Sequence, residues 1–176
     1  MKKTRRGFTL VELLIVIVVI GVLAAMMMLS SSEAVSSARA STIITNLRNL
    51  KTAALAMYND HMDTYDTTNV NTGTPYAIDQ SGYNVLQYLS GKGDIPDKGD
   101  YKLCMVAANN NSSNGWYIIY NTAALTGTEG ARIREKLAGR AKALGLIGTD
   151  ATDENKCGTP NGRYNGTGYW VGLQVR

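Results

Sequence analysis

The feature that most constrains the fold is an apolar run close to the N-terminus. Residues 8–29, FTLVELLIVIVVIGVLAAMMML, contain a single charged side chain, Glu12. At about 1.5 Å per helical residue, the run is roughly 30 Å long, which matches the hydrocarbon core of a bilayer. A basic head, MKKTRRG at residues 1–7, precedes it. Because basic flanks stay in the cytoplasm, the sequence predicts a membrane-spanning helix whose C-terminal side faces away from the cytoplasm.

The helix is expected to continue past the apolar run. From residue 30 the chain becomes polar, and its next proline is Pro75. Apolar residues recur there at helical spacing and form one stripe, namely Ile43, Leu47, Leu50, Ala54 and Met57. The pattern predicts one continuous helix from about Phe8 to about Met62. Its first part, residues 8–29, is apolar all round, and its second part, residues 30–62, is amphipathic.

Residues 63–176 are expected to form a globular α+β domain. Residues 63–82 are rich in Thr, Asn, Asp and Gly and indicate a loop, and a short helix is expected over 83–89. Three apolar runs predict strands, at Tyr101–Ala107, Trp116–Tyr120 and Tyr169–Val175. The stretch NNNSSNG, which ends at Gly115, is expected to join the first two as a hairpin loop.

A further helix is expected between the second and third of these strands. It should begin near Thr126, because Thr126 and Glu129 have the spacing of a capping box. Gly145 is a suitable end. The predicted fold class is therefore α+β: a long N-terminal spine helix with a small antiparallel sheet packed on its distal half.

The distribution of charge along the chain indicates which kinds of partner to expect. The chain has 18 Lys and Arg and 14 Asp and Glu, a formal charge of +4. The basic head holds four of the positive groups, which leaves 18 − 4 = 14 against 14 in the remainder. A nucleic-acid binder keeps its basic excess on the folded domain, so no direct nucleic-acid site is evident. A neutral domain repels its own copies weakly, which suits self-association.

The chain has two cysteines, Cys104 and Cys157. Two distant cysteines beyond a membrane segment are expected to form one disulfide in an oxidising compartment, and the alternative is two separate buried thiols. His61 is the only histidine, so the chain lacks ligands for an ordinary zinc site.

A small residue, Gly7, stands before the apolar run rather than after it. A secretory signal peptide has its small-residue cleavage site after the apolar core, and its core is shorter. The sequence KKTRRGFTLVELLIVIVVIGVLAA resembles the type III signal of type IV pilin-like proteins, which include pilins and type II secretion pseudopilins. The plainer alternative, a signal anchor that stays uncut, does not explain Glu12.

The resemblance implies a processing and assembly site. A prepilin peptidase would cut between Gly7 and Phe8, remove the leader at residues 1–7 and methylate the new Phe8 amine. Glu12 matches the acidic position of the family, where it would pair with the Phe8 amine of a neighbouring subunit and set the register of assembly. The alternative is that Glu12 pairs only within its own chain. Many family members carry a proline where this chain has Leu29.

Other candidate sites are weaker. Asp94, Asp97 and Asp100 lie three residues apart in GDIPDKGD. They are weak candidates for calcium, which some pseudopilins bind in this domain, but the full pattern of a calcium loop is missing and no metal is expected. His61 lies at the expected end of the spine helix, where a polar residue simply faces solvent. We expect no cofactor and no enzymatic activity.

The resemblance implies the structural subunit of a type IV pilus, used for adhesion, motility or DNA uptake. The alternative is a pseudopilin of a type II secretion system, and a remote third is a membrane-anchored enzyme or binding protein. A mature length near 169 residues and a cysteine pair in the distal half favour the pilus. The expected partners are other copies of the chain, the prepilin peptidase and an inner-membrane assembly platform. The precursor would lie in the inner membrane and the product in an extracellular filament, or in the periplasm for a pseudopilin.

Overall fold

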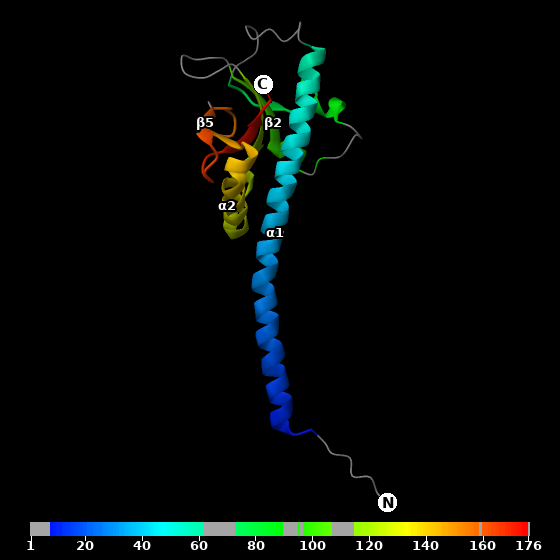
Figure 1. Cartoon of the computed structure of the whole chain (residues 1–176), viewed down its shortest axis with the longest axis vertical. Coiled ribbons are helices and arrows are strands. Elements are labelled where there is room, and N and C mark those ends of the chain that lie inside the picture. Colours follow the sequence, from blue (N-terminus) through cyan, green and yellow to red (C-terminus); the bar gives the residue numbers. More distant parts are fainter. Residues whose placement is uncertain are drawn as a thin grey trace, which may run out of the picture. The chain divides into compact units, whose positions relative to one another are not determined.

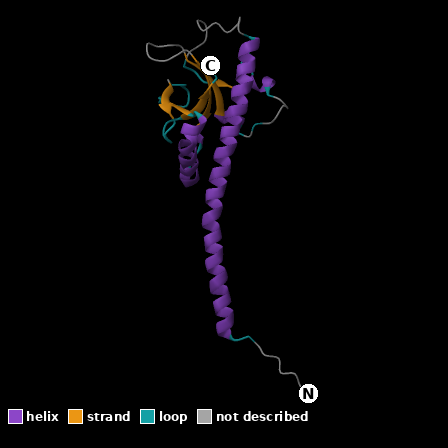
Figure 2. Cartoon of the chain, in the orientation of Figure 1, coloured by secondary structure: helices purple, strands orange, loops and turns teal. Residues whose placement is uncertain are grey.

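The computed structural model of the chain describes two compact units (Figure 1). The described residues are 8–61, 73–89, 95, 97–106, 115–158 and 160–175. The first unit ends at Val35 and the second runs from Ser36. Figure 2 shows that helix dominates the N-terminal part and that the strands of the described residues belong to the C-terminal part.

The expected spine helix is present as α1, Leu10–Asp60. It begins two residues after Phe8 and ends at Asp60, and the expected end at Met62 lies outside the described residues. The predicted stripe is buried, since Leu47, Leu50 and Ala54 are fully covered and Ile43 and Met57 nearly so. In the second unit α1 therefore supplies one wall of the core, as the periodicity of the sequence predicts.

Among the described residues the sheet has six strands, and every pair in it is antiparallel, in the order β1-β2-β3-β6-β4-β5. The expected strands are present as β2, β3 and β6, and β2 and β3 form a hairpin in which Val106 lies opposite Gly115. The intervening residues 107–114, which hold most of the predicted loop, lie outside the described residues. The strand bounds are β1 Tyr76–Ala77, β2 Tyr101–Val106, β3 Gly115–Asn121, β4 Ile147–Thr149, β5 Pro160–Arg163 and β6 Trp170–Gln174.

Three strands were not expected from the sequence. β1 lies inside the segment predicted as a loop, and β4 and β5 lie in the stretch after the second helix. They have two to four residues each, and β5 reads PNGR, which has no apolar alternation. β1 pairs with β2, β4 pairs with β6, and β5 pairs with β4. Such short strands depend on pairing with distant segments, so the local sequence carries little signal for them.

The remaining helices are short apart from α2, Gly127–Leu144. The helix expected over 83–89 is a 3-10 turn, η1 at Val85–Tyr88. Two further 3-10 turns precede β2 and follow β3, η2 at Lys98–Asp100 and η3 at Thr122–Ala124.

The capping box predicted for α2 is wrong. Thr126 is the N-cap, but its side chain makes no capping hydrogen bond, and Gly127 has a φ of 68°. Glu129 turns instead to Arg39 of α1, with 3.4 Å between Nη1 and Oε1. The expected end is right, since Gly145 closes the helix in the left-handed conformation, with φ 67°.

The sheet separates two apolar clusters, because successive side chains of a strand point to opposite faces. The larger cluster joins α1, α2 and one face of the sheet, with Leu103, Ile118 and Val171 fully buried in it. The smaller cluster, on the other face, holds Cys104, Tyr117, Ile119, Ala151, Cys157 and Trp170. The second unit is thus a three-layered arrangement in which the loop before β5 covers the face that the helices leave open.

Candidate functional site

Three reciprocal hydrogen bonds join Thr9 and Glu12 at the start of α1. The backbone N–H and the hydroxyl of Thr9 each donate to Oε2 of Glu12, both at 2.8 Å. The backbone N–H of Glu12 donates back to Thr9 Oγ1 at 3.3 Å. This is a capping box: Thr9 is the residue before the helix and Glu12 the third residue in it, so two N–H groups that lack helical partners are satisfied.

The capping box leaves part of the Glu12 carboxylate available. Both hydrogen bonds end on Oε2, and among the described residues Oε1 accepts none. An ionised carboxylate has about four acceptor positions. Glu12 can therefore hold the start of its own helix and still accept a hydrogen bond from a further donor.

The first turns of α1 are open to their surroundings. Phe8 is 88% exposed, and the large apolar side chains from Leu10 to Met28 are each at least half exposed. By length and composition, α1 is the one helix among the described residues that could cross a membrane. So large an apolar surface requires a lipid or protein environment, because monomeric soluble domains rarely expose patches of this extent.

The proposed cleavage position lies at the edge of the described residues. Gly7 lies outside them, and Phe8 is the first residue inside. The peptide bond between Phe8 and Thr9 is not the bond that the peptidase would cut. The N–H of Thr9, and with it the capping box, would therefore remain after cleavage.

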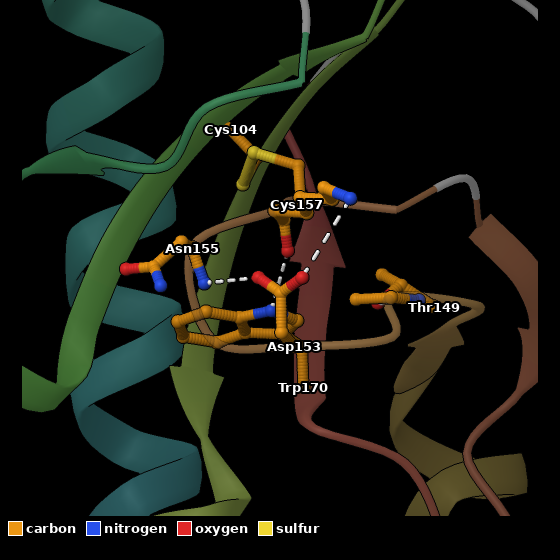
Figure 3. The surroundings of a disulfide bond; sticks show 8 residues. Cys104, Thr149, Asp153, Asn155, Cys157 and Trp170 are labelled. Carbon is orange, nitrogen blue, oxygen red and sulfur yellow. Dashed lines mark hydrogen bonds and ion pairs between the residues drawn. A yellow bond between two sulfur atoms is a disulfide. The ribbon is translucent and has the colours of Figure 1, made fainter.

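Cys104 and Cys157 are joined by a disulfide in the structure, at a sequence separation of 53 residues. Figure 3 shows it between β2 and the loop that precedes β5, with Trp170 of β6 nearby. Trp170 is buried, and its indole N–H donates to the carbonyl oxygen of Lys156 at 2.8 Å. The N–H of Cys157 donates to the carbonyl oxygen of Gly73, so this loop is also tied to the segment before β1.

The aspartates singled out as weak calcium candidates do not form a metal cluster among the described residues. Asp94 lies outside those residues. Asp97 directly precedes the turn η2 and Asp100 is its last residue, and Asp97 has a left-handed backbone, with φ 57°. Partial burial, followed by the nearby negative charge of Asp97, raises the pKa of Asp100. The positive charge of Lys102 offsets part of this rise in the pKa of Asp100.

His61 directly follows α1 and is exposed. Its Nε2 lies 3.1 Å from the hydroxyl of Tyr88, a hydrogen-bonding distance. The sequence places it correctly at the helix end, but the contact with η1 could not be read from the sequence, because it joins residues 27 positions apart.

Thr9 is the site residue that sequence reasoning missed. The signal was present, since Thr9 and Glu12 have the same Thr-x-x-Glu spacing as Thr126 and Glu129. Of the two candidate capping boxes, the structure forms the one at α1 and not the one at α2.

The fold and the N-terminal region together point to one class of protein. A long N-terminal helix, apolar in its first half, with a small antiparallel sheet on its second half is the pilin fold. The family described as the prokaryotic N-terminal methylation motif matches residues 2–28, and this motif is the signature of type IV pilins and pseudopilins. The motif therefore supports a type IV pilin-like or pseudopilin precursor. No curated protein and no solved structure matches it.

The motif also has consequences for processing and activity. It implies cleavage by a prepilin peptidase and assembly into a pilus or pseudopilus. The motif and the apolar helix fit a precursor anchored in the membrane. The proteins that carry the motif are structural rather than enzymatic.

Proposed function

We propose that the chain is the structural subunit of a type IV pilus, an extracellular filament that serves adhesion, motility or DNA uptake. The precursor is cut between Gly7 and Phe8, the Phe8 amine is methylated, and the mature chain polymerises through its N-terminal helix. The observation that carries the proposal is the methylation motif at residues 2–28 on a chain with the pilin fold.

Glu12 acts in assembly through its charge. In the interior of a filament an ionised carboxylate needs a cation, because an isolated buried charge is costly. Cleavage supplies one, the amine of Phe8, which stays protonatable after methylation. The amine of a neighbouring subunit meets Oε1 of Glu12, while Oε2 keeps its bonds to Thr9. Such a pair fixes the axial register of one helix on the next more than it adds to raw stability, since desolvation offsets much of the attraction.

Three variants separate the charge of Glu12 from its capping role. Glu12→Ala removes both. Glu12→Gln removes the charge and keeps an oxygen that can complete a capping box, because Gln also serves at this position. Thr9→Val removes the hydroxyl of the capping box and keeps the charge. Each variant is expressed in cells that carry the assembly machinery, and leader removal is checked by intact-mass analysis.

The charge role predicts normal cleavage and membrane insertion for all three variants. It also predicts few or no fibres for Glu12→Ala and Glu12→Gln, and near-normal fibres for Thr9→Val. Fibres of normal number and length from Glu12→Gln would refute the intersubunit pair. If instead only the two variants that disrupt the cap fail, the role of Glu12 is to start its own helix.

The pseudopilin of a type II secretion system remains the second candidate, because the methylation motif is common to both classes. The two differ in where the polymer grows. Electron microscopy of cells that make the chain distinguishes them: long surface fibres labelled by an antibody to the second unit support the pilus. Secretion that depends on the chain, without surface fibres, supports the pseudopilin.

A further inference from the structure

The segment between β5 and β6 contains an Asn-Gly dipeptide whose asparagine side chain is held by two hydrogen bonds. Asn165 is exposed and Gly166 is half-buried, and Oδ1 of Asn165 accepts two hydrogen bonds from Thr167. The backbone N–H of Thr167 donates at 3.0 Å and its hydroxyl at 2.6 Å. Because a backbone N–H can only donate, the bond from Thr167 N identifies the accepting atom as the side-chain oxygen and not the amide nitrogen.

We propose that Asn165 is a site of spontaneous deamidation, a covalent modification driven by the chain itself. The backbone nitrogen of Gly166 bonds to Cγ of Asn165 and gives up its proton. The bond from Cγ to Nδ2 breaks, and Nδ2 leaves as ammonia. Water then opens the resulting succinimide at either carbonyl group, which gives aspartate or isoaspartate. The net change is amide plus water to carboxylic acid plus ammonia.

Three features of the structure favour this reaction. The bond from Thr167 N to Asn165 Oδ1 holds the side chain alongside the backbone of residues 165–167, the segment that carries the attacking nitrogen. The two donors point at the oxygen on which negative charge develops as the nitrogen adds, so they stabilise the transition state as an oxyanion hole does. Gly166 has no side chain to shield its nitrogen, and its φ of 91° suits glycine.

A second Asn-Gly dipeptide, Asn161 and Gly162, serves as an internal control for the deamidation rate. This second Asn-Gly dipeptide is also exposed, but it lies within β5, where Gly162 pairs with Gly148 of β4. Oδ1 of Asn161 lies against β4, only 3.2 Å from where a Cβ at Gly148 would be. Its side chain is therefore directed at the neighbouring strand, and the ladder resists the backbone rotation that ring closure needs. A third Asn-Gly, at residues 114–115, begins outside the described residues.

The modification would change the surface without unfolding the domain. The loop is anchored on both sides: Tyr164 N donates to Leu146 O, and Gly168 O accepts from Thr122 Oγ1. Deamidation adds a negative charge between these anchors. Isoaspartate also adds one carbon to the main chain there. A chain that is not replaced would therefore change the charge of this loop with age, whether or not it forms a pilus.

The test is site-resolved mass spectrometry of the full-length protein in detergent, incubated in mildly alkaline buffer made with heavy-oxygen water. The solvent label identifies amides lost during the incubation. Asn165 should react at least about tenfold faster than Asn161, through proximity and oxyanion stabilisation. In denaturant with the disulfide reduced, the two rates should converge. Equal rates in the folded protein, or faster reaction at Asn161, would overturn the proposal.

Two variants test the role of the hydroxyl. Thr167→Val keeps the backbone donor and removes Oγ1, so it should slow Asn165 by about three- to tenfold, the effect of one exposed hydrogen bond on a rate. Thr167→Ser should retain the wild-type rate. A slow reaction at Asn161 in each variant shows that β5 is still paired and the domain folded. An unchanged rate at Asn165 in a folded Thr167→Val protein would also overturn the proposal.

Discussion

Gly172 occupies a position in the sheet where even one added methyl group should be costly. It lies in β6, opposite Ile119 of β3 on one side and Ile147 of β4 on the other. A Cβ at this position would overlap the carbonyl oxygen of Ile118 and would lie 2.7 Å from Cγ2 of Ile119 and 3.1 Å from its Cα. Two of these three atoms belong to the backbone of β3, so a change of side-chain rotamer cannot remove the clash.

The expected cost of Gly172→Ala follows from that geometry. Overpacking a well-packed core costs about 1–3 kcal/mol, and a clash with the backbone of a paired strand belongs at the upper end. We therefore expect the free energy of unfolding to fall by about 3 kcal/mol. For a domain of this size, each loss of about 1 kcal/mol in the free energy of unfolding lowers the thermal midpoint by about 3 °C. The expected shift of the thermal midpoint is therefore about 10 °C.

Gly139→Ala is the matched control. Gly139 is exposed on α2, and a Cβ there meets nothing within 4 Å. Because alanine favours a helix interior over glycine, the free energy of unfolding should rise by about 0.5–1 kcal/mol. The two variants make the same chemical change and should have effects of opposite sign.

Both variants are measured in the fragment Ser36–Arg176, which is one compact unit. Urea denaturation followed by tryptophan fluorescence gives the free energy, and circular dichroism gives the thermal midpoint. A loss below about 1 kcal/mol for Gly172→Ala would mean that β3 and β6 separate easily, contrary to the overpacking argument. A loss for Gly139→Ala as large as that for Gly172→Ala would show that the effect does not come from the sheet.

Two further predictions concern the second unit. Replacing both Cys104 and Cys157 with serine should lower the free energy of unfolding by up to about 4 kcal/mol, the loop-closure value for their separation. The same urea denaturation assay measures this loss. An unchanged denaturation midpoint would contradict the entropic argument. Burial raises the pKa of Tyr101 to about 12, although a hydrogen bond from Asn46 opposes the shift. Because this pKa exceeds the unfolded value, the contribution of Tyr101 to stability is complete below pH ~10 and falls between pH ~10 and ~12. Ultraviolet titration of the wild-type protein should show the delayed ionisation of Tyr101. A titration that is complete near pH ~10 would refute the raised pKa.

Much of the N-terminal half could be predicted from the sequence because its structure depends on local pattern. The apolar run predicts the first part of α1, which by length and composition could cross a membrane, and the stripe from Ile43 to Met57 predicts the face that is buried in the second unit. The order of Gly7, Phe8 and Glu12 around the start of the run led to the pilin-like class, which the match to the methylation motif confirms. The roles assigned to these three residues stay predictions.

The tertiary structure decided what depends on pairing between distant segments. The short strands β1, β4 and β5 have no clear pattern of their own; β1 and β4 form along the longer β2 and β6, and β5 forms along β4. Two Thr-x-x-Glu sequences offered the same local capping signal, yet Glu12 completes its box while Glu129 lies against Arg39. A local motif indicates which hydrogen bonds are possible. Which of them forms depends on the competing partners that the fold brings near, and for Glu129 that partner lies 90 residues away in α1.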